Sequence, residues 1–244
     1  YVVLAAGASE LGVLKLEKGE PVNALEFLAD FKKHDGNLDL GKNVVVIGGG
    51  NTAMDTARAA KRTKGVEHVY LVYRRTKRYM PADEEELVMA VEDGVEFKEL
   101  LAPKAQENGM LLCDVMKLGE MDASGRRGVV AIGETVSVPA DTIIAAVGEK
   151  VPTHFYETCS LNLNDRGKVL VNPDTKESSV KNVYVIGDGL GGPATVVEAI
   201  RDALTASEAI AGRKLVQDFD EKVTSEDVYP RRGSLLETQE GRVE

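Results

Sequence analysis

The sequence has no tryptophan, only two cysteines and only three histidines among its 244 residues. Cys113 and Cys159 stand far apart and form no Cys-x-x-Cys pair, so they predict no disulfide framework, and a reducing cytoplasm is the expected setting. The histidines are scattered, so their spacing predicts no metal site. Neither disulfides nor a metal ion is therefore expected to organise this chain.

The sequence also lacks a basic excess and a long apolar run. Its net charge of −10 argues against general binding of nucleic acid or of anionic membranes, and residues 74–78 are its only local basic run. No apolar run is long enough to span a bilayer, and the apolar residues 1–8 are too short and lack the positive flank of a signal peptide. What remains is an ordinary globular composition, 43% hydrophobic and 29% charged, with room for one or two domains.

The most informative stretch is a glycine-rich turn between an apolar run and a helical pattern. Residues 44–47 are four apolar residues in a row, which predicts a strand buried on both faces, as in a parallel sheet. Residues 51–62 have the pattern of a helix with several alanines. The turn between them fits Gly-x-Gly-x-x-Ala, the dinucleotide-binding fingerprint. Its residues are Gly48, Gly49, Gly50, Asn51, Thr52 and Ala53.

The spacing of this fingerprint has a chemical reason. Gly48 permits a tight turn, Gly50 lets a pyrophosphate approach the backbone, and Ala53 lets the helix pack near the strand. The helix N-terminus then offers free N–H groups and partial positive charge. A tight turn without a ligand is the alternative, but the strand, helix and following strand favour a nucleotide site.

The second strand, at residues 69–73, is followed directly by Arg74 and Arg75. An NAD site places a carboxylate at this strand end to bind the ribose 2′-hydroxyl, whereas an arginine accommodates the 2′-phosphate of NADP. A guanidinium group suits a phosphate because its planar fork donates paired hydrogen bonds and keeps its charge. The sequence therefore favours NADP over NAD; a solvated basic turn without a ligand is the alternative.

The remaining pattern divides the chain. A helix is expected at residues 23–33, and the acidic residues 83–86 are expected to form the solvated start of another. Residues 95–138 show short strands with turn signals, typical of an antiparallel meander, before a buried strand resumes at 141–148. A further buried strand ends at Gly187-Asp188, and a helix at 196–211 ends at Gly212. The abrupt buried strand at residues 1–8 suggests that the chain is part of something longer.

Together, residues 48–55, 72–75, 80–81 and 186–188 resemble the glutamate synthase small-subunit family, near its larger members, the selenate reductase subunits and NADPH-dependent oxidoreductases. The resemblance covers residues 1–211. It implies an α/β fold: a Rossmann-like NAD(P)-binding domain with an antiparallel β-meander, inserted in a FAD-binding domain of the two-dinucleotide-binding flavoprotein type. The implied boundaries are 1–36 and 150–212 for FAD-type pieces, 37–149 for the NADP-binding domain, and 213–244 for a tail or linker.

For NADPH, the resemblance implies that residues 48–53 hold the pyrophosphate and that Arg74 and Arg75 hold the 2′-phosphate. Gly148 would lie where the nicotinamide half passes the last strand of the domain. The implied reaction is hydride transfer from NADPH to flavin and on to a further acceptor. The cofactors carry that chemistry, so no side-chain acid, base or nucleophile is assigned.

For FAD, the resemblance implies that Gly187 and Asp188 lie at the ribitol, although a strand-end helix cap is the alternative for Asp188. The start of the last helix would face the flavin pyrimidine, through Pro193, Ala194, Thr195 and Val196. The family's first Gly-x-Gly-x-x-Gly and its iron–sulfur cysteines have no counterpart in this sequence. We therefore expect little FAD on this chain alone, and expect the N-terminal FAD and iron–sulfur parts, or an electron-accepting subunit, as partners. A non-catalytic nucleotide-binding fragment and a redox sensor or scaffold are the alternatives.

Overall fold

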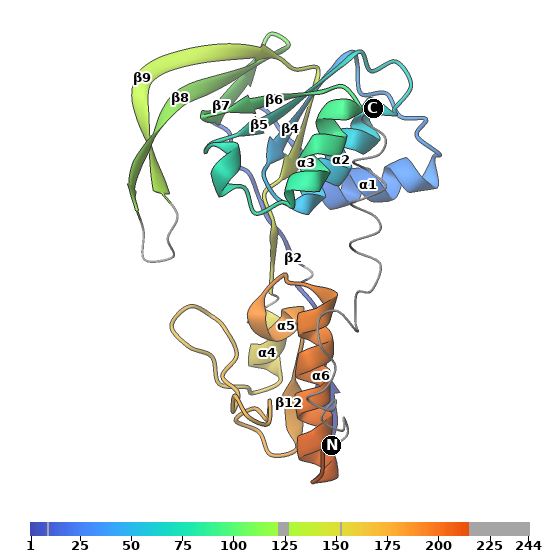
Figure 1. The fold of residues 1–244 in the computed structure, drawn as a ribbon, viewed down its shortest axis with the longest axis vertical. Helices are drawn as coiled ribbons and strands as arrows, with labels where there is room; N and C mark the ends of the chain where they lie inside the picture. Colours follow the sequence, from blue (N-terminus) through green and yellow to red (C-terminus); the bar gives the residue numbers. More distant parts are fainter. Residues whose placement is uncertain (9, 122–126, 152, 215–244) are drawn as a thin grey trace, which may run out of the picture. The chain divides into compact units, whose positions relative to one another are not determined.

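The computed structural model describes residues 1–8, 10–121, 127–151 and 153–214. The chain forms two compact units (Figure 1). One comprises Ala6–Pro152, and the other comprises Tyr1–Ala5 together with the chain from Thr153 onward. Within the described residues, no helix combines the length and apolar character needed to cross a bilayer.

The first unit is built on a five-stranded parallel sheet in the order β3-β10-β4-β5-β6. The strands are β3 (Val22–Asn23), β10 (Thr142–Ala146), β4 (Asn43–Gly48), β5 (His68–Tyr73) and β6 (Val95–Glu99). Residues 44–47 of β4 are all buried, as the apolar run predicts for a strand covered on both faces.

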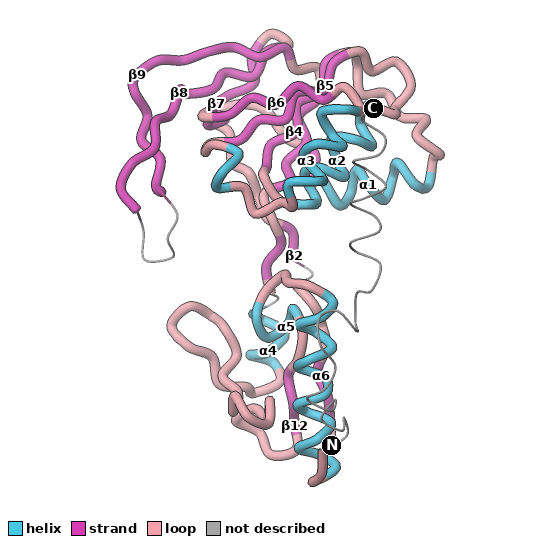
Figure 2. The backbone as a smooth tube through the Cα atoms, in the orientation of Figure 1, coloured by secondary structure: helices cyan, strands magenta, loops and turns pink. Residues whose placement is uncertain are grey.

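Helices cover one face of this sheet and a small antiparallel sheet covers the other (Figure 2). The helices are α1 (Ala24–Lys33), α2 (Asn51–Lys61) and α3 (Glu84–Glu92), and Val44 and Val46 pack in their core. The antiparallel sheet contains β7 (Leu101–Glu107), β8 (Met110–Met121) and β9 (Arg127–Pro139), and Val45 and Ile47 pack in its core. Alternate side chains of one strand thus serve two separate cores.

The predicted meander differs from the observed one at both ends. Residues 95–99 were predicted to begin it, but β6 pairs in parallel with β5 and belongs to the main sheet, because the crossover through α3 returns the chain to that edge. The strand at 101–107 was missed, since it contains Pro103. Residues 127–139 form one strand rather than two, with Gly133 at a φ of +85° inside it.

The second unit pairs β1 (Val2–Leu4) with β12 (Val183–Val185) in parallel. It also contains α4 (Thr153–Thr158), α5 (Asp188–Gly191) and α6 (Val196–Ala211). The predicted end of α6 at Gly212 is correct, since Gly212 adopts the left-handed conformation with a φ of +65°. Lys176 binds Asp202 of α6 at 3.2 Å, so a largely buried ion pair fixes the loop before β12 to this helix.

The observed units correct one expected boundary. The division expected after residue 36 falls after Ala5, because β3 pairs with β10 and Phe27 of α1 is buried in the core of the first unit. The second boundary, expected after residue 149, falls after Pro152. Most of the predicted tail, residues 215–244, lies outside the described residues.

Three further short elements lie in the first unit. The two-residue strands β2 (Glu10–Leu11) and β11 (Glu149–Lys150) pair antiparallel, and η1 (Lys77–Tyr79) is a single 3-10 turn after β5.

Candidate dinucleotide-binding site

Three predicted site segments meet at the carboxyl edge of the main sheet. Ile47 of β4 lies beside Val72 of β5, and Gly48 lies beside Ala146 of β10. The residues that follow these strands therefore share one edge: the glycine loop (residues 48–50), Arg74 and Gly148. The chain moves from β4 through α2 to β5 on one side, while β10 lies on the other. Such a reversal of strand order is where open α/β sheets bind ligands.

The glycine loop is tight on one side and open on the other. A Cβ added to Gly48 would lie 3.0 Å from the Cβ of Ala53, and one added to Gly49 would lie 2.7 Å from Cδ2 of Tyr73. Ala53 itself has no exposed surface. A Cβ added to Gly50 would meet only the Pro81 side chain, 4.0 Å away. Packing thus explains the small residues at 48, 49 and 53, and Gly50 leaves the backbone open to a ligand.

The N-terminus of α2 follows this open side. Gly50 is the N-cap residue and has no side chain to cap the helix, and the first turn contains no acidic residue. The N–H groups of the first turn and the helix dipole therefore favour an anion here.

A segment that the sequence prediction missed lies against this loop. Ala82 N donates to Gly49 O at 3.0 Å, and Asp83 N donates to the Asn51 side-chain oxygen at 3.0 Å. Asn51 Nδ2 in turn donates to Asp83 Oδ2 at 3.1 Å. The side chain of Asn51 thus binds protein on both sides, so what it offers a ligand is its backbone N–H. We call residues 80–83 the strap. The sequence singles out Met80-Pro81 in this segment, but the residues that the strap contacts are about 30 positions earlier in the chain, so spacing alone does not predict these contacts.

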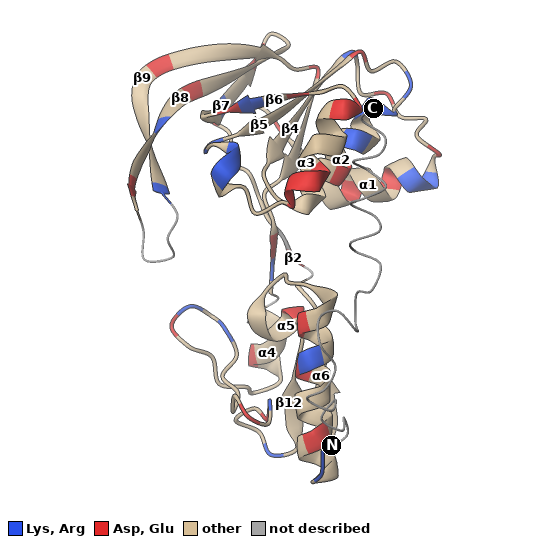
Figure 3. Cartoon of the chain, in the orientation of Figure 1, with Lys and Arg blue, Asp and Glu red and all other residues tan. Residues whose placement is uncertain are grey.

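The two arginines after β5 have different surroundings. Arg74 is exposed. Arg75 is half-buried, its Nε donates to the carbonyl oxygen of Arg127 at 2.8 Å, and its own carbonyl accepts from Leu100 N at 3.2 Å. Lys77 and Arg78 follow in η1 and are exposed. Figure 3 colours the basic residues of the chain blue. An NAD-type site requires a carboxylate at this strand end, and residues 74–79 contain none.

Gly148 is exposed, with a φ of +90° and no atom within 4 Å of an added Cβ. Its carbonyl accepts from Gly12 N at 2.9 Å, which ties the end of the last sheet strand to the segment before β3. The backbone at this position is therefore both fixed and accessible.

The site residues predicted for a flavin lie in the second unit. Gly187 precedes α5 with a φ of +63°, and Asp188 Oδ1 accepts from Ala194 N at 3.1 Å, so this carboxylate closes its own loop. Thr195 and Glu198 form a capping box at the start of α6. The backbone and side-chain hydrogen bonds from Thr195 lower the pKa of Glu198. Pro193, Ala194 and Val196 are exposed.

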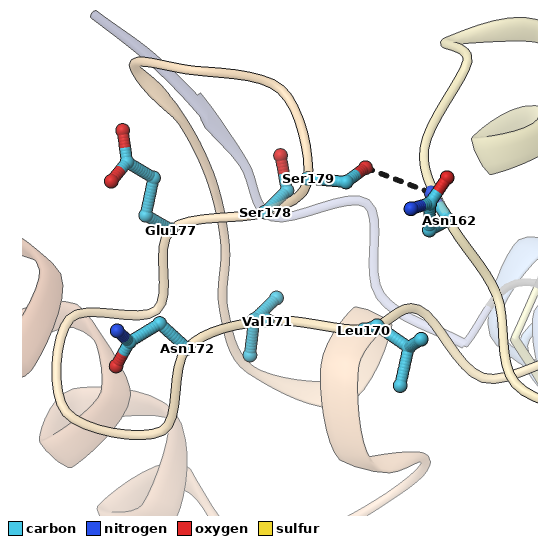
Figure 4. A pocket seen from close by; sticks show the side chains of 7 residues that line it. All are labelled: Asn162, Leu170, Val171, Asn172, Glu177, Ser178 and Ser179. Atoms are coloured by element: carbon cyan, nitrogen blue, oxygen red, sulfur yellow. Dashed lines mark hydrogen bonds between the residues drawn. The ribbon is translucent and has the colours of Figure 1, made fainter.

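The second unit also contains a shallow pocket of about 360 Å³ (Figure 4). Ser179 Oγ accepts there from Asn162 N at 2.9 Å, and Glu177 Oε1 accepts from Asn182 N at 2.7 Å, so these polar groups bind the pocket's own loops. The lining residues are Asn162, Leu170, Val171, Asn172, Glu177, Ser178 and Ser179. Among the described residues, no group of three His, Cys, Asp or Glu is arranged to hold a metal ion.

The model of the family described as "Pyridine nucleotide-disulphide oxidoreductase" matches residues 1–203. The chain belongs to this family. Its curated relatives include the putative oxidoreductase YgfK of Escherichia coli K12, 38% identical over 96% of this chain and 23% of that protein. The glutamate synthase [NADPH] small chain of Azospirillum brasilense is 37% identical over 80% of this chain and 40% of that protein. These relatives confirm the resemblance to the glutamate synthase small-subunit family.

A third relative is the NADP(+)-dependent formate dehydrogenase subunit beta of Moorella thermoacetica, 36% identical over 86% of this chain and 31% of that protein. The chain thus spans a quarter to two fifths of the length of these relatives.

Two solved structures share the fold. FprA of Mycobacterium tuberculosis, in complex with NADPH, matches with a TM-score of 0.68 and 20% identity over 95% of this chain and 69% of that one. Thioredoxin reductase of T. acidophilum matches with a TM-score of 0.64 and 22% identity over 87% of this chain and 65% of that one. At these identities the likeness shows the fold, and it confirms the predicted two-dinucleotide-binding α/β class.

Proposed function

We propose that this chain is the NADPH-binding part of a flavoprotein oxidoreductase, in which hydride passes from NADPH to FAD and on to a further acceptor. The observation that supports this proposal most is the open space beside Gly50 at the N-terminus of α2, a helix without a side-chain cap. The basic turn that follows β5, the strand next to β4, lies at the same edge of the sheet. NADPH and FAD, when bound, supply the redox chemistry, and the protein supplies binding and alignment.

The residues of the first unit fit NADPH. The backbone N–H groups of Gly49–Thr52 and the α2 dipole would hold a pyrophosphate, for which Gly50 leaves room. Arg74 is exposed and would bind the 2′-phosphate, while Gly148 would let the nicotinamide half pass close to the backbone. Each of these roles is one of binding and orientation, so no side chain is assigned a proton transfer.

The second unit fits only part of a FAD site. Asp188 accepts a hydrogen bond from its own loop, and Thr195 and Glu198 bind each other, so the remaining donors at the start of α6 are backbone N–H groups. The Gly-x-Gly-x-x-Gly that opens the family's FAD domain has no counterpart in this sequence, and Gly187-x-Gly189-x-x-Gly192 spans only the four-residue helix α5. We propose that further parts of the parent protein, or an electron-accepting subunit, complete this site, and that the chain alone retains little FAD. The unpaired thiols of Cys113 and Cys159 favour a reducing, cytoplasmic setting.

Nucleotide binding without catalysis is the second candidate, because only one of the two predicted cofactor sites is complete within this sequence. The visible absorbance of the purified chain separates the two. A retained flavin band favours an oxidoreductase as it stands, whereas its absence, with NADPH binding intact, favours the binding part.

Substitution of Arg74 tests the NADPH assignment. Arg74→Ala is expected to weaken NADPH binding by about 1.5 kcal/mol, roughly tenfold, because a charge-assisted hydrogen bond to the 2′-phosphate is lost. Arg166, an exposed arginine of the second unit, is the matched control, and Arg166→Ala is expected to bind as the wild type does. Unchanged NADPH affinity in Arg74→Ala would show that the 2′-phosphate lies elsewhere.

A further inference from the structure

The hairpin of β8 and β9 extends beyond its neighbouring strand. β7 pairs with residues 110–115 of β8 only, whereas β8 and β9 continue to pair to Met121 and Arg127 (Figure 2). We call residues 116–121 and 127–131 the distal hairpin. A two-stranded ribbon without a third strand is marginally stable in water, so its position depends on other contacts.

Arg75 supplies such a contact. Its Nε donates to the carbonyl oxygen of Arg127, the first residue of β9, at 2.8 Å. Its own carbonyl accepts from Leu100 N, and Leu100 O accepts from Met116 N at 2.8 Å. Arg75 therefore links the end of β5, the start of β7 and the distal hairpin through one side chain and one backbone group.

This contact brings a further arginine next to the basic turn. Arg127 is half-buried and its Nε donates to Gly119 O at 2.9 Å, which fixes its side chain along the hairpin. The fork of a guanidinium group has five donors, and within the described residues the terminal nitrogens of Arg127 and Arg75 make no hydrogen bond.

A cluster of cations lies here, comprising Arg74, Arg75, Lys77, Arg78 and Arg127. In the part of the chain that the structure describes, no ion pair involves the side chains of the cluster, although Glu99 lies close and accepts from Lys77 N at 3.1 Å. By contrast, Arg58 of α2 and Arg62, which caps the C-terminus of that helix, each bind Asp93 at 2.8 Å. Cations without an ion pair among the described residues are candidates to bind an anion.

We propose that the distal hairpin forms one wall of the 2′-phosphate subsite, with Arg75 as the residue that positions it and Arg127 as an additional phosphate-binding residue. This inference rests on the proposed NADPH function. It identifies the ligand group as a phosphate monoester dianion, and it makes preference for NADPH depend on residues 52 positions apart in the sequence. It also couples phosphate binding to the position of the distal hairpin, because the bound phosphate would hold the hairpin in place.

The test compares NADPH and NADH affinity in the full chain by fluorescence titration. Arg127→Ala keeps the carbonyl that Arg75 binds, so it is expected to weaken NADPH binding about tenfold and leave NADH unchanged. Arg75→Lys keeps a positive charge but loses the planar fork, so it is expected to weaken NADPH and to speed hydrogen exchange of the distal hairpin amides. Lys117→Ala removes an exposed cation from the same hairpin and is the matched control, with no expected change.

The difference in hydrogen exchange between the NADPH-bound and the nucleotide-free chain gives a readout that a purely structural role for Arg75 would not produce. NADPH is expected to protect the distal hairpin amides in the wild type, and NADH is expected to protect them less. If the wild type prefers NADPH but neither Arg127→Ala nor Arg75→Lys lowers that preference, the hairpin inference is wrong and the NADPH assignment stands. If the wild type binds both nucleotides equally, the NADPH assignment is itself wrong.

Discussion

Asn51 and Asp83 hold each other through two hydrogen bonds, one from Asn51 Nδ2 to Asp83 Oδ2 at 3.1 Å and one from Asp83 N to Asn51 Oδ1 at 3.0 Å. Asn51 is the first residue of α2, and Asp83 is the N-cap residue of α3. The pair therefore joins the starts of two helices and keeps the strap beside the glycine loop. The open side of Gly50 faces Pro81 of this strap.

Removal of the Asp83 carboxylate should loosen the strap. Asp83→Ala is expected to lower the free energy of unfolding by about 0.5–1 kcal/mol, because one exposed side-chain hydrogen bond is lost. Asp83→Asn keeps an acceptor for Asn51 Nδ2, so it should lose less. Urea denaturation at neutral pH measures both, and an Asp83→Ala variant as stable as the wild type would contradict the role given to the pair.

Two neighbouring glycines should respond differently to alanine. Gly50→Ala is expected to fold with nearly unchanged stability, because its Cβ enters open space, but to bind NADPH at least about tenfold more weakly, because that space is proposed for the pyrophosphate. Gly49→Ala is expected to destabilise the fold, since its Cβ meets the Tyr73 ring.

Thermal unfolding and NADPH titration of the two glycine variants form one comparison. A Gly50→Ala chain that keeps wild-type affinity would place the pyrophosphate away from this loop.

The two cysteines should differ in reactivity. Burial raises the pKa of the Cys113 thiol to about 12, so almost none of it is thiolate at neutral pH, whereas Cys159 is only half-buried. A disulfide reagent is expected to label one thiol per native chain and two in denaturant. The Cys159→Ser variant should show no fast labelling when native; rapid labelling of that variant would contradict the burial of Cys113.

Asp141 should contribute to stability above its pKa only. Its Oδ2 accepts from the backbone N–H groups of Asn43 and Lys42, at 2.8 and 2.9 Å, and from Asn43 Nδ2, which lowers its pKa below 3.8. Since the folded state binds the ionised form, this stability is fully present above about pH 5 and is lost as the pH falls below about 4 through the folded-state pKa.

Asp141→Asn is therefore expected to be less stable than the wild type at pH 7, by about 1 kcal/mol after allowance for solvent screening, with a smaller difference at pH 3. Asp165→Asn, at an exposed loop position, is the control and should show no such trend. Urea denaturation at the two pH values measures the difference, and a constant difference would contradict the assignment.

The parts of the fold and the site that the sequence predicted are those with local signals. The strand, glycine loop and helix at residues 43–61 follow from the apolar run and the fingerprint, and the cap residues Asn23 and Gly212 follow from helix-end chemistry. Each of these depends on residues a few positions apart.

The missed features depend on distant residues. Asn51 and Asp83 are 32 positions apart, and Arg75 and Arg127 are 52 apart. Apolar and polar residues alternate in 95–99, as in an edge strand of either sheet. Only the parallel pairing with β5 shows that this strand belongs to the main sheet. The boundary at Ala5 likewise depends on the two-residue strand β3 pairing with β10, which no local pattern indicates.

The most direct measurement is isothermal titration calorimetry of the purified wild-type chain with NADPH and, separately, with NADH. The two nucleotides differ only in the 2′-phosphate, so their affinities isolate the contribution of the basic turn after β5. We expect NADPH to bind at least about tenfold more tightly, with a preference that declines as salt screens the exposed Arg74. Equal affinity for NADPH and NADH, or no binding of either, would contradict the proposed NADPH site.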